Sequence, residues 1–433
     1  MGGDGTAALA TVHHLKPRSA VPARTDAGNA AAMVDQYADD LRYAPSRGSW
    51  LRWAGTRWAW CEDDGEPVQA AIATIQNLPA DGEDDYKHQI KSLSRRSLEA
   101  MVALARRDPA IRVTADQLDA DPHSLNAPNG VIDLRDGTIR GHDRGEMHTK
   151  VTGVTYDPDA AAPRWEQFLA DTFGGDTDMA TFVQRLAGYS ACGMVTHHVL
   201  PFLHGGGGNG KSVFLDVLLS VLGDYASTAP AGFLMAGAKD DENAVARLSG
   251  LRLVVCSEVN QGAKFDEAKI KLLTGGDRLT ARFLYQRHFT FQPSHTLWLM
   301  GNHQPRVDAG GESFWRRLRL LPFTVKVPDS KRVEGLATQL AEAEAEKAAR
   351  ELATLVTTSV ICMASWRLAC ASRFFSARFC RISSCSWRSA SAAAFLASSA
   401  TFSAVPRAFV STSSLAESSA TCFRRWRSFA TAG

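Results

Sequence analysis

Short apolar runs and segments of helical periodicity alternate between residues 199 and 325. Four of the apolar runs have the length of strands, and the sequence there reads HVLPFLHG, LRLVVCSEV, HTLWLMGN and LRLLPFTV. Just ahead of them, PRWEQFLADTFGGDTDMATFVQRLAGYSACG predicts two amphipathic helices separated at Gly174-Gly175. Strands that alternate with helices indicate a parallel sheet with helices on its faces. We therefore expect an α/β fold in this part of the chain.

Helices and antiparallel hairpins are predicted in the preceding region. Thr25 and Asp26 are N-cap candidates for a helix that begins TDAGNAAAM, and SLSRRSLEAMVALARRD also has helical periodicity. GSWLRWAGTRWAWC alternates around a Gly-Thr turn, and NGVIDLRDGTIRG joins two short runs through Asp136-Gly137, so each predicts a hairpin. The four tryptophans of the first hairpin indicate core packing, and a base-stacking surface is the alternative.

The composition changes abruptly at residue 354. Residues 354–433 carry nine Arg and one Glu, lack Asp, Lys and Asn, and have Ser or Ala at 34 of 80 positions. We expect a disordered tail or the product of a shifted reading frame, and a basic DNA-binding arm is the alternative. The remainder of the chain then has a net charge of −6. Any contact with DNA must therefore come from a local basic patch.

Neither the N-terminus nor the cysteines suggest export or membrane insertion. Residues 1–24 lack the apolar core of a signal peptide and are expected to be a disordered lead-in, and nothing before residue 354 could span a bilayer. Cys61, Cys192 and Cys256 occur singly in apolar surroundings, and no C-x-x-C pair is present. We interpret them as buried free thiols of a cytoplasmic protein.

The segment GGGGNGKS matches the phosphate-binding loop pattern and lies between a predicted strand and a predicted helix. Glycines allow successive backbone N–H groups to turn toward phosphate oxygens, and the helix N-terminus favours an anion. Four glycines could alternatively be a flexible linker, but a linker does not explain the whole pattern. The predicted ATP-binding residues are Gly205, Gly206, Gly207, Gly208, Asn209, Gly210, Lys211 and Ser212.

Lys211 is expected to bind the β- and γ-phosphates, and the Ser212 hydroxyl to ligate Mg²⁺. A metal-side acid is expected in addition, and Glu258 stands at the end of the strand LRLVVCSEV. This carboxylate could hold the Mg²⁺ shell or polarise the attacking water. Ser257 occupies the position where many nucleotide hydrolases have a second acid. Glu258 therefore serves both roles, or Ser257 holds a metal-bound water; an ordinary exposed Glu is the simpler alternative.

Two further candidates follow along the chain. Asn302 ends the strand HTLWLMGN, where an amide can orient the attacking water; a turn-forming Asn is the alternative. Arg316 and Arg317 precede the strand RLRLLPF and are candidates for an arginine finger that reaches a neighbouring subunit's γ-phosphate. With Arg319, they could instead form a solvated strand edge.

Lys211, Glu258, Asn302 and Arg317 follow one another in the order found in superfamily 3 DNA helicases. More closely, the chain resembles the phage and plasmid primase–helicase family of the satellite-phage and poxvirus type. The resemblance covers about residues 25–330 and rests on several segments. These segments are TDAGNA, LRYAPSRGSWLRWAGTRW, LNAPNGVIDLRDG, VTGVTYDPDA, QRLAGYSACG, HGGGGNGKS, LTGGDRLTARFLYQRHFTF, GNHQP and FWRRLRLLPF.

The resemblance implies an AAA+-like P-loop motor over 161–330, preceded by an α+β module over 25–160. A helix over 331–353 and the tail over 354–433 complete the expected organisation. The resemblance also implies a homo-hexamer that hydrolyses ATP between subunits and pulls single-stranded DNA through its centre in the 3′→5′ direction. It favours Arg317 as the finger, with Arg316 as the alternative. It further places Arg287 and His288 at the tip of a DNA-binding hairpin, where a merely solvated loop is the alternative.

The expected activity is that of an ATP-dependent DNA helicase that initiates replication of a phage, plasmid or integrated element. Its expected partners are single-stranded or forked DNA and replication proteins of the element or host, without a membrane. Primase activity is not expected, because only about two dozen residues precede the first family segment. Where family members usually continue into a small C-terminal domain, this sequence has the Ser-, Ala- and Arg-rich segment 354–433. The alternatives are a DNA-stimulated ATPase or loader without unwinding, and a truncated, inactive remnant.

Overall fold

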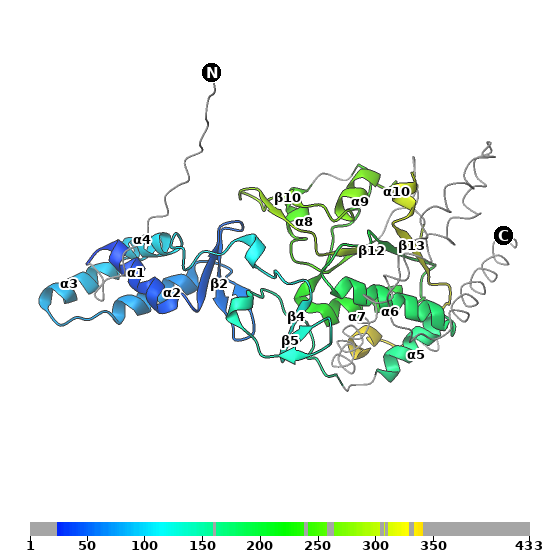
Figure 1. Ribbon diagram of the computed structural model, residues 1–433, viewed down its shortest axis with the longest axis horizontal. Helices are drawn as coiled ribbons and strands as arrows, with labels where there is room; N and C mark the ends of the chain where they lie inside the picture. The colour runs from blue at the N-terminus through cyan, green and yellow to red at the C-terminus, as the bar shows by residue number, and fades with distance from the viewer. Residues whose placement is uncertain are drawn as a thin grey trace, which may run out of the picture.

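The secondary structure falls into an N-terminal α+β region and a larger region built on a parallel sheet (Figure 1). The computed structural model describes residues 24–158, 162–237, 241–257, 264–303, 307, 311–328 and 333–340. The predicted lead-in up to residue 23, most of the predicted helix over 331–353 and the tail over 354–433 lie outside these residues. Among the described residues, no helix has the length and apolar character needed to span a bilayer.

Five parallel strands form the central sheet of the larger region, as the alternation of strands and helices predicts. Their spatial order is β13-β7-β12-β9-β8, and every neighbouring pair runs parallel. The strands are β7 (Leu200–His204), β8 (Ala226–Thr228), β9 (Leu253–Cys256), β12 (Thr296–Gly301) and β13 (Leu318–Pro322). Four of them are the predicted apolar runs. The edge strand β8 has the sequence Ala-Ser-Thr, which contains no apolar run and gave no signal.

Helices cover both faces of the sheet, which explains why its three inner strands β7, β9 and β12 are apolar without alternation. One face packs against α5 (Pro163–Thr172), α6 (Thr177–Ala191) and α7 (Lys211–Leu222), and the other against α8 (Glu242–Ala246), α9 (Glu267–Leu273) and α10 (Glu312–Trp315). Along β9, Leu253 and Val255 join the core on the α7 face, whereas Val254 and Cys256 join the core on the opposite face. Gly174 and Gly175 have positive φ and separate α5 from α6, as predicted.

The N-terminal region packs helices against a small antiparallel sheet of order β1-β2-β3. Its elements are α1 (Asp26–Tyr37), β1 (Leu41–Ala44), β2 (Ser49–Trp53), β3 (Trp58–Trp60), α2 (Gly65–Gln76), α3 (Glu83–Ser92) and α4 (Arg95–Ala105). The Thr25 hydroxyl caps α1 by accepting a hydrogen bond from the amide of Gly28 at 3.1 Å. Trp50 and Trp58 are fully buried, which confirms core packing for these two rings. Trp53 and Trp60 are only partly buried, so two rings of this hairpin still have a face that other groups can reach.

A second small sheet joins the N-terminal region to the larger one. It contains β4 (Ser124–Ala127), β5 (Gly130–Asp133) and β6 (Ile139–Arg140), and β5 pairs with β6 as the Asp-Gly turn predicts. Its buried apolar side chains share a core with α5, α6 and α7. The buried Arg252 guanidinium donates hydrogen bonds of 2.5 Å to the carbonyls of Ser124 and Ala191, and lies 4.6 Å from the Tyr225 ring centroid. This arginine therefore ties β4 to α6 and to the sheet.

The three cysteines of the described chain are free and buried, as predicted. Burial raises the pKa of the Cys61 thiol to about 12, that of Cys192 to about 11 and that of Cys256 to about 12. These thiols are therefore protonated at neutral pH. The Cys61 thiol donates a hydrogen bond to Glu66 Oε2 at 2.7 Å, whereas Cys192 and Cys256 behave as small apolar groups.

The order of the strands creates a switch point between β7 and β12. The chain leaves β7 into α7 on one face of the sheet, whereas it proceeds from β12 to α10 on the other face. Because the two connections diverge, the topology predicts a crevice at the carboxyl ends of these neighbouring strands. Crevices of this kind are where open parallel sheets bind their ligands.

Candidate functional site

The glycine-rich segment connects β7 to α7 at this crevice and forms a loop that only glycine permits at its first position. Gly205 has a φ of +154°, and a Cβ atom there would lie 2.0 Å from the carbonyl oxygen of Phe323. Gly206 and Gly207 instead face open space, with no atom within 4 Å of the Cβ that a side chain would add. Among the described residues, the amides of Gly206, Gly207 and Gly208 donate no hydrogen bond. The loop thus presents polar backbone groups to an open face, which is the requirement for an anion cradle.

Lys211 begins α7 and turns its ammonium back into the loop. Its Nζ donates to the carbonyl oxygens of Gly205 at 2.7 Å and Gly206 at 3.0 Å, and to Asn209 Oδ1 at 3.0 Å. A fourth acceptor is Asn302 Oδ1, at 3.1 Å. The lysine is only 5% exposed, so the loop holds a buried cation whose position is fixed by several acceptors at once.

Asn209 anchors the loop to the edge strand β13. Its Nδ2 donates to the carbonyl oxygen of Phe323 at 2.6 Å, and the amide of Val327 donates to the carbonyl of Gly208 at 2.9 Å. Because its Oδ1 accepts from Lys211, this one amide orients both the loop and the ammonium. Asn209 is 4% exposed, which makes it a buried part of the loop framework.

The predicted residues Lys211 and Asn302 meet although 91 positions separate them in the chain. The reason is the register of the sheet, in which Gly301 of β12 lies beside His204 of β7. Asn302, the residue after β12, therefore lies beside the first residue of the glycine-rich loop, which follows β7. Burial and the Lys211 charge lower the pKa of His204, so its imidazole is neutral and adds no positive charge at pH 7.

The remaining residues of the predicted metal site are only partly described. The Ser212 hydroxyl is exposed in the first turn of α7 and lies 3.7 Å from the sulfur of Met300. Glu258 lies outside the described residues, and its strand β9 is next to β12 rather than next to β7. Among the residues that the structure describes, no cluster of three or more His, Cys, Asp or Glu could hold a metal ion.

The described donors nevertheless fit a nucleoside triphosphate with its metal. The open loop face, the N-terminus of the twelve-residue helix α7 and the Lys211 ammonium all favour phosphate oxygens. The exposed Ser212 hydroxyl is a hard oxygen donor beside this face, as Mg²⁺ requires.

The two finger candidates point in different directions. The Arg317 guanidinium lies inside the protein, where Nε donates to Thr274 Oγ1 at 3.0 Å and Nη1 donates to the Ser313 carbonyl. Arg317 is 8% exposed, whereas the side chain of Arg316 is exposed. The residue that the sequence favours for contact with another subunit is therefore engaged within its own chain.

The hairpin predicted to bind DNA exists, but its tip lies ahead of the two basic residues predicted to form it. β10 (Leu279–Ala281) and β11 (Phe289–Phe291) pair antiparallel, and the turn falls at Leu284 and Tyr285. Placing Arg287 and His288 at the tip was wrong, because both follow the turn on the returning arm. Arg287 is exposed, and His288 Nε2 lies 3.4 Å from Glu242 Oε2 on α8. The apolar residues Leu284 and Tyr285 in the segment RFLYQRH mark this exposed turn in the sequence.

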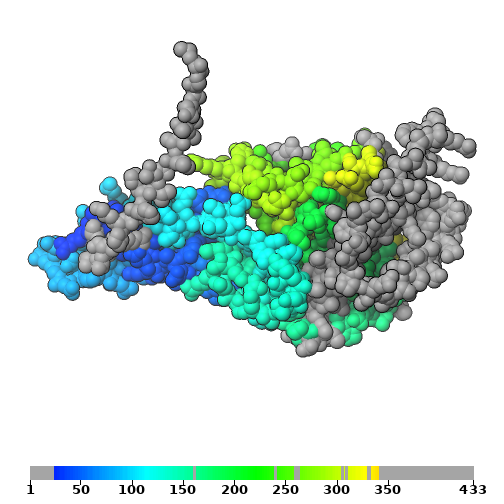
Figure 2. Space-filling model, in the orientation of Figure 1, coloured from blue at the N-terminus to red at the C-terminus, as the bar shows by residue number. Residues whose placement is uncertain are grey.

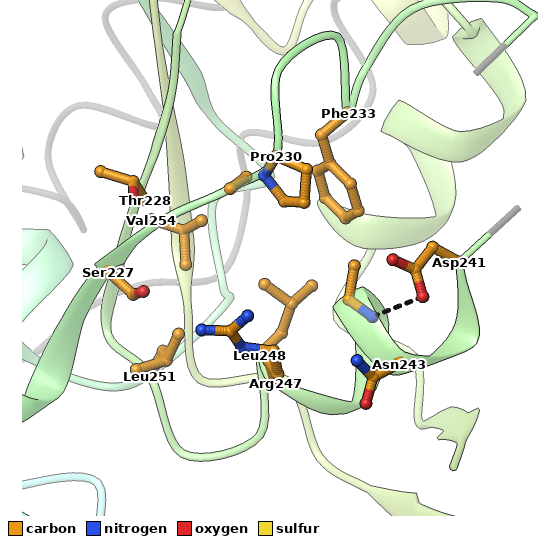
Figure 3. Close-up of a pocket in the computed structure, with 12 residues that line it drawn as sticks. Ser227, Thr228, Pro230, Phe233, Asp241, Asn243, Arg247, Leu248, Leu251 and Val254 are labelled. Carbon is orange, nitrogen blue, oxygen red and sulfur yellow. Dashed lines mark hydrogen bonds between the residues drawn. The ribbon is translucent and has the colours of Figure 1, made fainter. Parts of the chain in front are cut away.

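A separate pocket lies on the other side of the sheet, between β8 and α8 (Figure 3). Ser227, Pro230, Asp241 and Arg247 are among its lining residues, and the Asp241 carboxylate there accepts the amide hydrogen of Ala244. Its cavity volume of about 40 Å³ has room for one or two water molecules, so it is too small for a nucleotide.

Two family models match different parts of the chain. Residues 30–174 match the family described as D5 N terminal like, and residues 203–317 match a family of unknown function, DUF5906. A protein of Acanthamoeba polyphaga mimivirus named "Putative helicase L207/L206" is 26% identical over 216 residues, which are 48% of this chain and 22% of that protein. "Putative primase C962R" of African swine fever virus is 25% identical over 218 residues, 48% of this chain and 23% of the relative.

Among solved structures, the apo C-terminal region of NrS-1 matches with a TM-score of 0.48 and 12% identity, covering 75% of this chain and 71% of that one. The chain spans less than a quarter of the length of the two curated relatives described above. The family matches and the viral relatives confirm the resemblance to the phage and viral primase–helicase family.

Proposed function

We propose that this chain is an ATP-dependent helicase that translocates on single-stranded DNA to initiate replication of a phage, plasmid or integrated element. The observation that carries the proposal is the meeting of Lys211 and Asn302 at the switch point of the sheet. A buried ammonium and a strand-end amide at one anion-binding loop supply the charge and the hydrogen-bonding group that γ-phosphate hydrolysis needs. Relatives named as helicases and primases support a role in DNA replication.

In this proposal the loop amides and Lys211 bind the β- and γ-phosphates of ATP, and Asn302 orients the attacking water. Ser212 and Glu258 are the residues that would hold Mg²⁺, which supplies positive charge against the phosphate oxygens when it is bound. The Lys211 ammonium then exchanges its carbonyl acceptors in the loop for phosphate oxygens. Because these acceptors are neutral, their replacement by negatively charged phosphate oxygens gives Lys211 stronger hydrogen bonds.

Assembly into a homo-hexamer would place an arginine of one subunit against the nucleotide of its neighbour. The exposed Arg316 can make such a contact without disturbing its own chain, whereas Arg317 would first have to leave Thr274 and Ser313. We therefore assign the finger to Arg316 and a supporting role to Arg317. Forked DNA and replication proteins of the element or host are the proposed partners.

The test combines ATP turnover with strand displacement. Purified protein is assayed for ATP hydrolysis with and without single-stranded DNA, and for displacement of a labelled strand from forks that have 3′ or 5′ tails. We expect DNA to stimulate turnover, and displacement to require the 3′ tail. Lys211→Ala should abolish both activities because the charge on the γ-phosphate is lost, whereas Lys91→Ala on α3, far from the loop, should retain them.

The alternatives give different results in the same assays. DNA-stimulated turnover without displacement would indicate a loader or translocase that does not unwind. A chain that binds no nucleotide in the presence of magnesium and stays monomeric would be an inactive remnant. Retained turnover in Lys211→Ala would mean that hydrolysis takes place at another site.

A further inference from the structure

The hairpin formed by residues 279–291 has an unusual composition for an exposed element. Its sequence LTARFLYQRHFTF contains two Arg, one His and four aromatic residues, but no Asp or Glu. Phe283 and Phe289 stack on each other with ring centroids 5.6 Å apart, which stiffens the two arms near the turn. Cations interleaved with aromatic rings are the combination that binds single-stranded nucleic acid, because phosphates and bases are both satisfied.

At its turn this hairpin presents apolar side chains to solvent. Tyr285 is 95% exposed and Leu284 is 67% exposed. Tyr285 also has a φ of +62°, in the left-handed region that costs an L-residue roughly 1–2 kcal/mol. The chain thus holds an aromatic ring in solvent in an unfavourable backbone conformation, and packing against the described residues offsets little of this cost because Tyr285 is almost wholly exposed. Such a conformation is typical of a binding residue.

The N-terminal region adds a cation to the same place. The Arg47 guanidinium, in the turn between β1 and β2, lies 4.3 Å from the Trp60 ring centroid and 5.4 Å from that of Phe283. In the part of the chain that the structure describes, Arg47 has no carboxylate partner. Its positive charge is therefore held by two rings and is available to an anion.

Other contacts fix the two regions together at this point. A Cβ atom at Gly48 would lie 2.7 Å from the Gln286 side chain, so the turn after Arg47 is in direct contact with the hairpin. At the base of the hairpin, Arg278 forms an ion pair of 3.0 Å with Asp116. Figure 2 shows the yellow-green surface of the hairpin region against the blue and cyan surface of the N-terminal region.

We propose that the turn of the hairpin and the β1–β2 turn form one surface for single-stranded DNA, in which Tyr285 stacks on a base while Arg47 and Arg287 bind phosphates. The N-terminal region thereby becomes part of the DNA-binding site. The choice of DNA rests on the proposed function, whereas the surface itself rests on the contacts described above. A protein partner is less well matched, because the cations lie beside a ring that is almost wholly exposed and can stack on any base.

The first test is equilibrium binding of a fluorescent oligo(dT) to the full chain, measured by anisotropy without nucleotide. Tyr285→Ala should weaken binding about 5- to 150-fold, the range expected for the loss of one base–aromatic stack. Tyr285→Phe keeps the ring and should bind like the wild type. Tyr86→Ala removes an exposed tyrosine from α3, remote from the hairpin, and serves as the matched control. Thermal melting of each variant confirms that it is folded.

The second test separates stacking from ionic contacts by the dependence of affinity on salt. Arg47→Ala should lower the slope of log affinity against log salt by about 0.7, as the loss of one phosphate contact on a single strand predicts. Tyr285→Ala should leave the slope unchanged. Arg107→Ala removes an exposed arginine of the same region and should change neither affinity nor slope by a comparable amount.

Wild-type affinity in Tyr285→Ala, or a slope in Arg47→Ala equal to that of Arg107→Ala, overturns the proposed surface even if the protein hydrolyses ATP. A change of oligomeric mass in Tyr285→Ala with unchanged DNA affinity also overturns it and identifies a contact between copies of the chain. Conversely, a protein that hydrolyses no ATP but loses DNA affinity in both variants supports the surface while the motor proposal fails.

Discussion

Replacement of Gly205 by alanine tests whether the loop is built as described. The perturbation is one methyl group at the end of β7, where the chain turns into the loop. The matched variant is Gly206→Ala, which adds the same methyl group one residue later. The two changes are chemically identical, so any difference between them reports the local geometry.

The expected cost at Gly205 follows from three contributions. A φ of +154° is unfavourable for alanine by about 1–3 kcal/mol. The Cβ would lie 2.0 Å from the Phe323 carbonyl oxygen, which belongs to the backbone and must move, at about 1–3 kcal/mol. The hydrogen bond from Asn209 to that oxygen would also be disturbed, at about 1 kcal/mol. Gly205→Ala should therefore lower the free energy of unfolding by about 3–7 kcal/mol.

Gly206→Ala should change the free energy of unfolding by no more than about 0.5 kcal/mol, because its Cβ meets no atom within 4 Å and its φ is not in the left-handed region. Urea unfolding followed by tryptophan fluorescence measures both, since Trp165 and Trp298 are buried in the core around the sheet. Equal unfolding midpoints for the two variants would refute the close approach of the loop to Phe323.

Three further predictions concern the site and the core. Arg317→Ala should lower the free energy of unfolding by about 1.5–3 kcal/mol, because a hydrogen-bonded buried cation is lost. Arg316→Ala should keep stability and nucleotide binding but lose hydrolysis. Mixing Arg316→Ala with Lys211→Ala subunits should partly restore hydrolysis. A destabilised Arg316→Ala with an unaffected Arg317→Ala would reverse the assignment. Asn302→Ala should bind ATP but turn it over at least about tenfold more slowly, measured by single-turnover hydrolysis, and normal turnover would exclude its role on the attacking water. Burial lowers the pKa of His295 to about 4, so below about pH 6.5 the unfolded state takes up a proton that the folded state does not. The free energy of unfolding should therefore fall by up to about 3 kcal/mol as the pH decreases from about 6.5 to about 4. This decrease should be smaller in His295→Asn.

Local signals allowed much of the fold to be predicted from the sequence. The apolar runs identified four of the five strands of the central sheet. Three of these, β7, β9 and β12, are buried on both faces and must therefore be apolar along most of their length. The loop pattern located the glycines and Lys211, because positive φ and close approach require glycine at particular positions. The Asp-Gly turn between β5 and β6 and the Thr25 cap were also found, because both depend on only a few adjacent residues.

The position of the hairpin turn could not be predicted, because several residues of RFLYQRH are compatible with a turn. The basic residues suggested a tip at Arg287 and His288, but stacking of Phe283 on Phe289 places the turn between these two rings. Arg47 gave no signal either, since its importance arises from Phe283, which is more than 200 positions away.

Sequence alone therefore determined the local elements of this protein: the glycine-rich loop, the apolar strands, the caps and the hairpins. Tertiary structure decided which of them meet. The strand order brings Asn302 to Lys211, and of two adjacent arginines only Arg317 turns inward to Thr274. The physical reason is that conformational preferences act over a few residues, whereas strand order and side-chain burial depend on packing the whole chain at once.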